Sequence, residues 1–193
     1  MRENTKTKIV NVTNIKMITF TALMAAVFCI LGPLAIPIGP VPITLGVICV
    51  YLCVYALGMN MGSIACILYI LLGLVGLPVF SGFAGGPAKL FGPTGGYIVG
   101  YVFMALVSGW FIDRFSVKKI YMQILGMILG LVVLYAFGTV WFVFQMQVTF
   151  AEALSMCVIP FVAFDLIKIG LALLFGNTIR KALSVANLMS YYN

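Results

Sequence analysis

Residues 17–88 contain no aspartate, glutamate, lysine or arginine. The whole chain of 193 residues is 64% hydrophobic and 8% charged, whereas soluble domains are about 25% charged. An uncharged stretch of this length cannot cover a soluble surface, so the chain is predicted to be an integral membrane protein. Its apolar runs are continuous and do not alternate with polar residues, which argues against a membrane β-barrel. We therefore predict an all-α fold, since a helix satisfies its own backbone hydrogen bonds in lipid.

Glycine, proline and polar residues divide the apolar sequence into six segments, and a membrane helix needs about 20 apolar residues. The predicted spans are residues 17–36, 43–57, 63–77, 93–112, 120–144 and 153–179. We expect one transmembrane domain over residues 1–193, a compact bundle of six helices with a cytoplasmic segment at residues 1–16. The second and third spans are short, so we expect them to be tilted, broken or covered by the others.

Basic residues cluster at the ends of the predicted spans. All but two of the eleven lysine and arginine residues lie in residues 1–16, 114–119 and 180–181. With six crossings these segments share one side of the membrane, and the positive-inside rule makes that side the cytoplasm. Both termini are therefore predicted to be cytoplasmic, and the net charge of +7 reflects orientation and not nucleic-acid binding. Lys89 and Lys168 are the two cations that orientation does not explain.

The last predicted span contains two ionisable residues, Asp165 and Lys168. A charge at the centre of a membrane helix costs about 2.5–3.5 kcal/mol on insertion scales, and residues three apart lie on one helix face. One interpretation is an internal ion pair that only lowers the cost of burial. The other is a ligand site, because such residues commonly face a cavity. Asp165 lies about 18 Å along the helix from Ala153, at about 1.5 Å per residue, so the pair would form the floor or wall of an outward-facing pocket.

Lys89 lies in a glycine- and proline-rich segment, residues 81–97, between two predicted spans. Glycines such as Gly85 and Gly86 permit tight turns and close approach of the backbone to a ligand, so this segment is predicted to cover the site. An ordinary solvated turn is the alternative, but it suits a shorter connection better. The Gly-Lys-Ser/Thr pattern of a P-loop does not occur in the sequence, so the chain does not hydrolyse ATP through one.

Two further polar residues, Thr44 and Tyr97, lie near the ends of predicted spans. Thr44 can either cap a helix or contact a ligand, and the ring of Tyr97 can pack against one. In the first span, Ala22 and Ala26 are four residues apart, a spacing of small residues that lets another helix approach closely. Such pairs are common in membrane helices, so the spacing alone is a weak signal for a docking surface.

The chain has no histidine, and its five cysteines all lie in apolar segments. The cysteines are expected to be buried as small hydrophobic residues, so neither a metal site nor a cofactor is predicted. A membrane enzyme needs a nucleophile and a base, commonly serine with histidine, so we do not expect an enzyme. A transporter that works alone is a further alternative, but alternating access is often built on internal repeats, and the six spans show none.

Three segments of the chain together resemble one known family. Residues 37–44, 85–97 and 164–168 are similar to the BioY family, the biotin-specific substrate-binding (S) components of energy-coupling factor (ECF) transporters. The resemblance extends over about residues 17–181. The glycine- and proline-rich segment is its specific part, because an Asp-x-x-Lys pair alone would not identify a family.

The resemblance implies a multi-pass protein of the prokaryotic cell membrane that binds biotin with high affinity at an outward-facing site, for vitamin uptake. Its partners would be a transmembrane coupling (T) component, docked at Ala22 and Ala26, and two ABC-type ATPase subunits. The ligand-binding residues expected on this basis are Thr44, Gly85, Gly86, Lys89, Tyr97, Asp165 and Lys168. An S component for another vitamin, such as thiamine or riboflavin, is the alternative.

Overall fold

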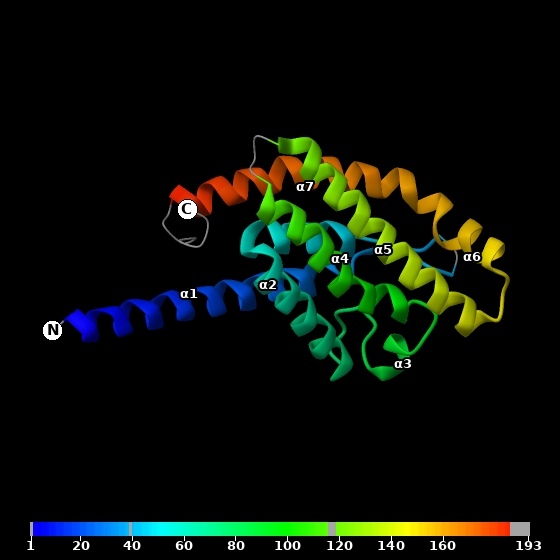
Figure 1. Cartoon of the computed structure of the whole chain (residues 1–193). Coiled ribbons are helices and arrows are strands. Elements are labelled where there is room, and N and C mark those ends of the chain that lie inside the picture. Colours follow the sequence, from blue (N-terminus) through cyan, green and yellow to red (C-terminus); the bar gives the residue numbers. More distant parts are fainter. Residues whose placement is uncertain (1, 39, 116–118, 186–193) are drawn as a thin grey trace.

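The computed structural model describes the backbone of residues 2–38, 40–115 and 119–185, and within these ranges the side chains from residue 15 onward. Lys118 and the basic side chains of residues 1–14, which contribute to the predicted orientation, lie outside what is described. The elements, shown in Figure 1, are α1 (Arg2–Leu31), β1 (Ala35–Ile36), β2 (Ile43–Thr44), α2 (Gly46–Leu74), α3 (Pro87–Leu90), α4 (Gly95–Arg114), α5 (Ile120–Met146), α6 (Phe150–Cys157) and α7 (Ile159–Val185). The two short strands pair antiparallel, so the described chain is all-α apart from one hairpin, as predicted.

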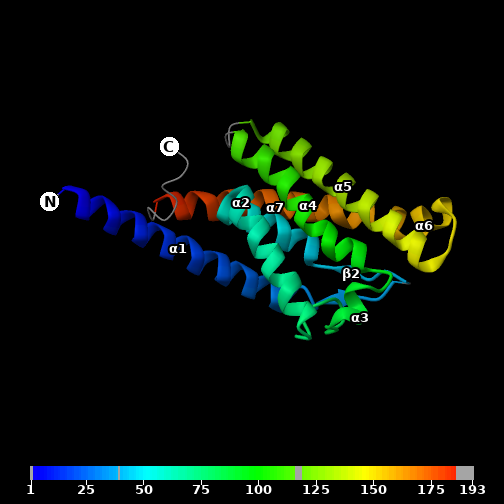
Figure 2. The ribbon, with the colours of Figure 1, turned by 60° about the horizontal axis from the view of Figure 1, so that its bottom comes forward.

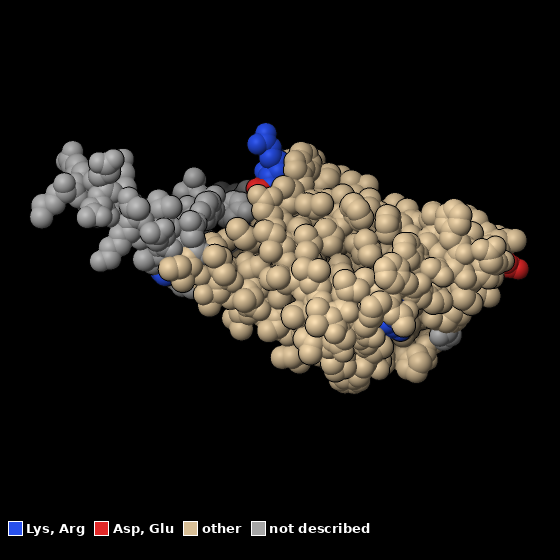
Figure 3. Space-filling model, turned by 90° about the horizontal axis from the view of Figure 1, so that it is seen from below, with Lys and Arg blue, Asp and Glu red and all other residues tan. Residues whose placement is uncertain are grey.

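Apolar helices long enough to cross a membrane make up most of the described chain. Four of them, α2, α4, α5 and α7, meet the requirements of length and hydropathy, and α1 adds a shorter apolar segment, Ile15–Leu31. On the face shown in Figure 3, charged residues occur at a few isolated points and most of the surface is uncharged. The predicted class, an integral membrane protein built from helices, is therefore confirmed.

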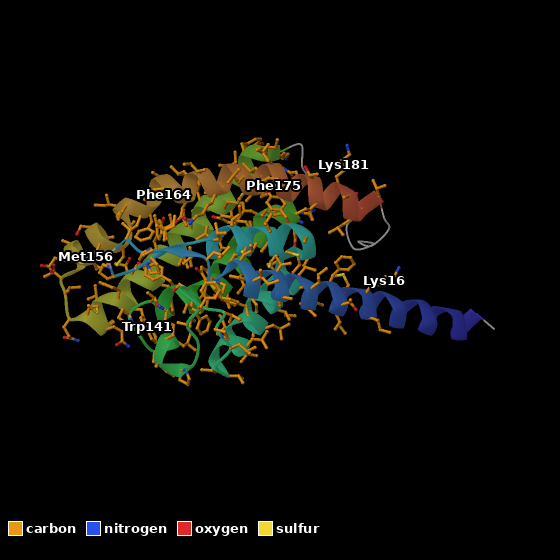
Figure 4. The ribbon with its side chains drawn as sticks, turned by 180° about the vertical axis from the view of Figure 1, so that it is seen from behind. Lys16, Trp141, Met156, Phe164, Phe175 and Lys181 are labelled. Carbon is orange, nitrogen blue, oxygen red and sulfur yellow. The ribbon has the colours of Figure 1, made fainter. Side chains whose placement is uncertain are left out.

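The two ends of the bundle differ in structure. The start of α1 and the end of α7 lie toward one end, whereas the β1–β2 hairpin, α3 and α6 lie toward the other (Figures 1 and 2). Seen from behind, Lys16 and Lys181 lie toward the first end, and Trp141 and Met156 lie toward the second (Figure 4). We call these the terminal end and the loop end.

The central helix, α2, is bent at Gly58. It packs against α1, α4 and α7, and both of its halves contain many buried residues. Gly58 has φ 78° and ψ 179°, a backbone conformation open essentially only to glycine. The helix resumes directly at Met59, whose N–H donates to Oδ2 of Asp113 at 2.7 Å, so this carboxylate satisfies a donor that the bend leaves free. The second and third predicted spans are therefore the two halves of one bent helix.

The first predicted span ends earlier than expected. α1 ends at Leu31 and does not continue to residue 36, since Gly32 disfavours a helix and Pro33 has no N–H to donate. Gly32 has no room for a side chain, because a Cβ there would lie 2.9 Å from the hydroxyl of Tyr69. The residues released from the helix form the hairpin at the loop end.

The last predicted span, residues 153–179, is two helices in the structure. α6 begins with a capping box, in which Thr149 and Glu152 bond each other's backbone N–H groups. The hydrogen bonds from the N–H and hydroxyl of Thr149 lower the pKa of the Glu152 carboxyl. The helix breaks at Val158, and α7 follows with Pro160 in its first turn, where the missing N–H costs no helical hydrogen bond.

The core between the helices is filled by aliphatic, aromatic and sulfur-containing side chains. Tyr51 and Tyr55 of α2 are fully buried, and each donates its hydroxyl to α5. Tyr51 bonds the backbone oxygen of Met127 at 2.8 Å, and Tyr55 bonds Oε1 of Gln123 at 3.1 Å. Four of the five cysteines are buried and all five are free thiols, as expected of small hydrophobic residues. The hydrogen bonds of Tyr51 and Tyr55 hold α5 in a fixed rotation against α2.

Candidate ligand-binding site

A pocket of about 610 Å³, its open mouth included, lies between the helices and is bordered at one end by the β1–β2 hairpin of the loop end. Its wall comes from the β1–β2 hairpin, both halves of α2, the start of α4, the middle of α5 and the α6–α7 junction. The wall is largely aliphatic and aromatic, and its polar groups include four tyrosine hydroxyls and one ion pair. This combination suits a small, mostly apolar ligand that offers a few hydrogen-bonding groups.

The ion pair is Asp165 with Lys168, which the sequence placed on one face of a helix. Nζ of Lys168 donates to Oδ1 of Asp165 at 2.7 Å, and the residues are only 3% and 8% exposed. Both line the pocket, so the predicted meeting of the two side chains beside a cavity is confirmed. Asp165 lies six residues into α7, about 9 Å along its axis. The predicted 18 Å from Ala153 assumed one continuous helix, whereas α6 and α7 are separate helices.

Tyr135 of α5 makes the second strong bond to this carboxylate. Its hydroxyl donates to Oδ2 of Asp165 at 2.5 Å, and Tyr135 also lines the pocket. Both carboxylate oxygens therefore accept a hydrogen bond from the protein, one from α7 itself and one from α5. An ionised acid that is paired and hydrogen-bonded in this way can be buried at a tolerable cost.

Thr44 and Tyr97 also line the pocket. The hydroxyl of Thr44 accepts from the N–H of Gly46 at 3.2 Å and lies 3.4 Å from the hydroxyl of Tyr101. Thr44 is therefore not the cap of α2, whose N-cap is Leu45, although its hydroxyl bonds the first N–H of that helix. Its contact with a ligand stays a prediction. The hydroxyl of Tyr97 lies 3.3 Å from that of Thr139, which holds its ring against α5.

Gly85, Gly86 and Lys89 are not among the residues that line this pocket. Gly86 has φ 84° and donates its N–H to the backbone oxygen of Gly73 at 2.7 Å. A Cβ on Gly85 would lie 2.3 Å from the backbone oxygen of Leu77. These glycines therefore pack the segment against the end of α2, and their contact with a ligand stays a prediction.

Lys89 lies in the short helix α3 and is half-buried. Its burial lowers the pKa of the ammonium group below the ordinary value, because desolvation disfavours the charged form. The segment that carries Lys89 reaches the pocket through Ser81 on one side and Thr94 on the other. It is anchored to α5 by the indole N–H of Trp141, which donates to the backbone oxygen of Gly92 at 3.0 Å.

The predicted docking residues lie on the outside of α1. Ala22 and Ala26 are exposed, whereas Ala25 between them is buried. Their neighbours Leu23 and Ile30 are also exposed, at 55% and 69%. The small pair therefore faces away from the bundle, as a docking surface requires, although this exposure alone does not identify a partner.

Sequence reasoning missed most of the tyrosines of the site: Tyr69, Tyr101 and Tyr135 line the pocket beside the predicted Tyr97. A signal existed for Tyr101, since it follows Tyr97 by four residues and therefore lies on the same helix face. Tyr69 and Tyr135 gave no comparable signal, because each lies within an apolar span. Their roles depend on contacts between helices.

Comparison with known proteins gives a consistent result. A model of the BioY family matches residues 3–185. The chain is 39% identical over 175 residues to biotin transporter BioY2 of Lactococcus lactis subsp. cremoris, covering 91% of this chain and 96% of that protein. It is 41% identical over 149 residues to biotin transporter BioY of Thermotoga maritima, covering 77% and 86%. Among solved structures, it is similar to the S-component for biotin from an ECF-type ABC transporter, with a TM-score of 0.81, 32% identity, and coverage of 89% of this chain and 94% of that one.

Proposed function

The chain belongs to the BioY family, and on that premise we propose that it is the biotin-binding S component of an ECF-type ABC transporter. It takes up a vitamin and is not an enzyme. The observation that carries the proposal is the buried Asp165–Lys168 pair, which lines a pocket walled by aromatic and aliphatic side chains. A carboxylate beside an ammonium offers hydrogen-bond acceptors and donors within one small area, which is what a cyclic urea requires.

Biotin matches this pocket group by group. Its ureido ring has two N–H donors and one carbonyl acceptor, so Asp165 accepts from an N–H and Lys168 donates to the carbonyl. The apolar thiophane ring packs against aromatic side chains such as Tyr97, next to the hydroxyl of Thr44. For the carboxylate tail we propose Lys89 or the backbone of the Gly85–Gly86 turn as the partner; none of the three lines the pocket itself, but their segment borders it at Ser81 and Thr94.

The proposed orientation places the loop end outside the cell and both termini in the cytoplasm. Lys16, Arg180 and Lys181 belong to the basic segments that the positive-inside rule assigns to the cytoplasm, and Lys16 and Lys181 lie toward the terminal end (Figure 4). If each half of α2 crosses the membrane, the chain makes six passes as one domain over residues 1–193. The pocket then opens outward.

The proposed partners follow from what the family implies and from the exposed face of α1. A T component docks on Ala22 and Ala26, where small residues permit close helix contact, and two ABC-type ATPase subunits supply the energy. No P-loop pattern occurs in this sequence, which agrees with an energy source on other subunits. No cofactor is proposed, since biotin is the cargo.

Ligand binding by the purified chain tests the proposal. Protein expressed without biotin should bind biotin, and not thiamine or riboflavin, in isothermal titration calorimetry. Asp165→Asn removes a charge-assisted hydrogen bond, worth about 1.5–3 kcal/mol, so biotin affinity should fall by about ten- to a hundred-and-fifty-fold. Glu152→Gln is the matched control, since Glu152 is exposed and lies outside the pocket lining, and glutamine also completes a capping box. Preference for another vitamin would change the proposed ligand, and unchanged affinity in folded Asp165→Asn would favour a purely structural ion pair.

A further inference from the structure

Both oxygens of the buried Asp165 carboxylate are held by donors from two different helices. Lys168 of α7 bonds Oδ1 at 2.7 Å, and Tyr135 of α5 bonds Oδ2 at 2.5 Å. All three side chains line the same pocket. The lysine is local to the acid, whereas the tyrosine is 30 residues away in sequence. The second bond therefore exists only because the fold brings α5 to the pocket.

The Tyr135–Asp165 bond joins two helices that otherwise pack on different partners. α5 packs mainly against α4, and α7 packs mainly against α2. The pocket lies between them, lined by Leu134 and Tyr135 from α5 and by Asp165 and Lys168 from α7. A hydrogen bond at this place fixes the distance between two pocket walls.

The bond also fixes the direction of the carboxylate. The terminal torsion of an aspartate is broad, so one bond at Oδ1 leaves the plane of the group free to turn about it. A second bond at Oδ2 removes that freedom. A carboxylate has about four lone-pair sites, so after these two bonds each oxygen keeps an acceptor position for a ligand, with a defined direction. The hydroxyl oxygen of Tyr135 also keeps its own acceptor capacity.

We propose that Tyr135 is a positioning residue that orients Asp165 toward the N–H donors of the ligand's cyclic urea. This inference rests on the proposed function for the identity of the ligand, but the orienting bond itself does not. Tyr135 acts through Asp165, so its removal should weaken every ligand that carries the ureido ring. In Asp165→Asn, which has no carboxylate to orient, removing the Tyr135 hydroxyl should have little effect on ligand affinity.

The sequence permits a direct test, because Asp113 and Asp165 are its two aspartates. Protein labelled with ¹³C at the aspartate carboxyl carbon should give two carboxyl signals, and Asp113→Asn assigns them. In ligand-free protein, Tyr135→Phe should shift the Asp165 signal and leave the Asp113 signal in place. Tyr121→Phe is the matched control, since Tyr121 lies on the same helix and is 62% exposed. An unmoved Asp165 signal in Tyr135→Phe would overturn the proposal.

Affinity measurements supply the second arm of the test. Tyr135→Phe should weaken biotin and desthiobiotin to a similar extent, because both carry the ureido ring. The loss should not exceed that expected for Asp165→Asn, about ten- to a hundred-and-fifty-fold, since Tyr135 acts through that carboxylate. In an Asp165→Asn background, Tyr135→Phe should change the affinity by less than about twofold, because the carboxylate through which Tyr135 acts is already absent. Equal losses in both backgrounds, or a loss for biotin alone, would overturn the positioning role. Failure of the unmodified protein to bind biotin would count against the proposed function, while the carboxyl signals would still test the orienting bond.

Discussion

The bend at Gly58 makes a sharp prediction about stability. With φ 78° and ψ 179°, this residue occupies a region that side chains avoid, at a cost on the order of 1–3 kcal/mol. Gly58→Ala should therefore lower the free energy of unfolding by about that amount. The alternative for the mutant is to straighten the chain at this point, which would move Met59 away from Asp113 and break their 2.7 Å hydrogen bond. Since α2 is the central helix, neither response can be confined to the surface.

The buried cysteines provide the assay. A fluorogenic maleimide reacts with thiols only when they become accessible, and four of the five thiols are buried, so heating with the dye reports unfolding. In domains of this size a change of 1 kcal/mol moves the midpoint by about 2–4 °C, so Gly58→Ala should unfold about 2–12 °C lower.

Gly170→Ala is the matched control for this experiment. It lies in α7, and a Cβ there would meet no atom within 4 Å. Alanine is a better helix former than glycine by about 1 kcal/mol, so the midpoint should stay the same or rise slightly. A Gly58→Ala variant that unfolds with the control would refute the reasoning and show that the bend tolerates a side chain.

Three shorter predictions concern docking, orientation and pH. Replacing Ala22 and Ala26 together with tryptophan should abolish co-purification with the coupling and ATPase subunits and leave biotin binding by the isolated chain intact; loss of biotin binding would instead place the pair in internal packing. In intact cells an impermeant thiol reagent should label a cysteine at Phe91 and spare one at Lys181, and the reverse pattern would contradict the orientation. Burial lowers the pKa of Lys89. Its positive charge, and any attraction to the biotin carboxylate, should therefore be complete below that pKa and lost as pH rises through it. This loss should occur at a lower pH than for an ordinary lysine. Lys89→Arg stays charged and should remove this alkaline loss of affinity in binding titrations; an unchanged pH profile would assign the carboxylate to other groups.

The helical membrane fold could be predicted from composition, because residues 17–88 carry no charge and an uncharged apolar stretch prefers lipid to water whatever its tertiary contacts. The boundaries of helices depend on tertiary contacts, and these were harder to predict. Gly58 and Asp113 show the reason, since the helix resumes at Met59 with a carboxylate from 54 residues away as its partner. The Gly32–Pro33 pair is a local signal for the early end of α1, but the apolar residues that follow it led to a predicted span that was too long.

At the site, too, features set by local sequence could be predicted and features set by tertiary contacts could not. Asp165 and Lys168 could be paired from sequence because three residues along a helix bring side chains to one face, whatever the rest of the fold does. Tyr135 could not be added, because its bond to Asp165 depends on where α5 lies. Gly85 and Gly86 were predicted as ligand contacts, and this stays a prediction. In the structure Gly86 has a positive φ and Gly85 has no room for a Cβ, so both pack their segment against the end of α2.

The described carboxylates differ in what they do for the fold. Asp113 accepts from the backbone N–H of Met59 and pairs with Arg180 at 3.2 Å, so it ties three helices together. Glu152 accepts from the backbone N–H of Thr149 and starts α6. Both acids thus satisfy backbone donors at helix ends, a role that folding itself requires.

Asp165 differs because its two hydrogen bonds come from side chains, those of Tyr135 and Lys168. Exchanging a buried ion pair for apolar residues of similar volume is often neutral or stabilising, so this pair is a weak contributor to stability. If α7 needed only to be buried at this point, leucine and methionine in place of Asp165 and Lys168 would make the protein at least as stable. The placement of the pair at a pocket, with a tyrosine from another helix to orient the acid, therefore favours the ligand-binding interpretation over the purely structural one.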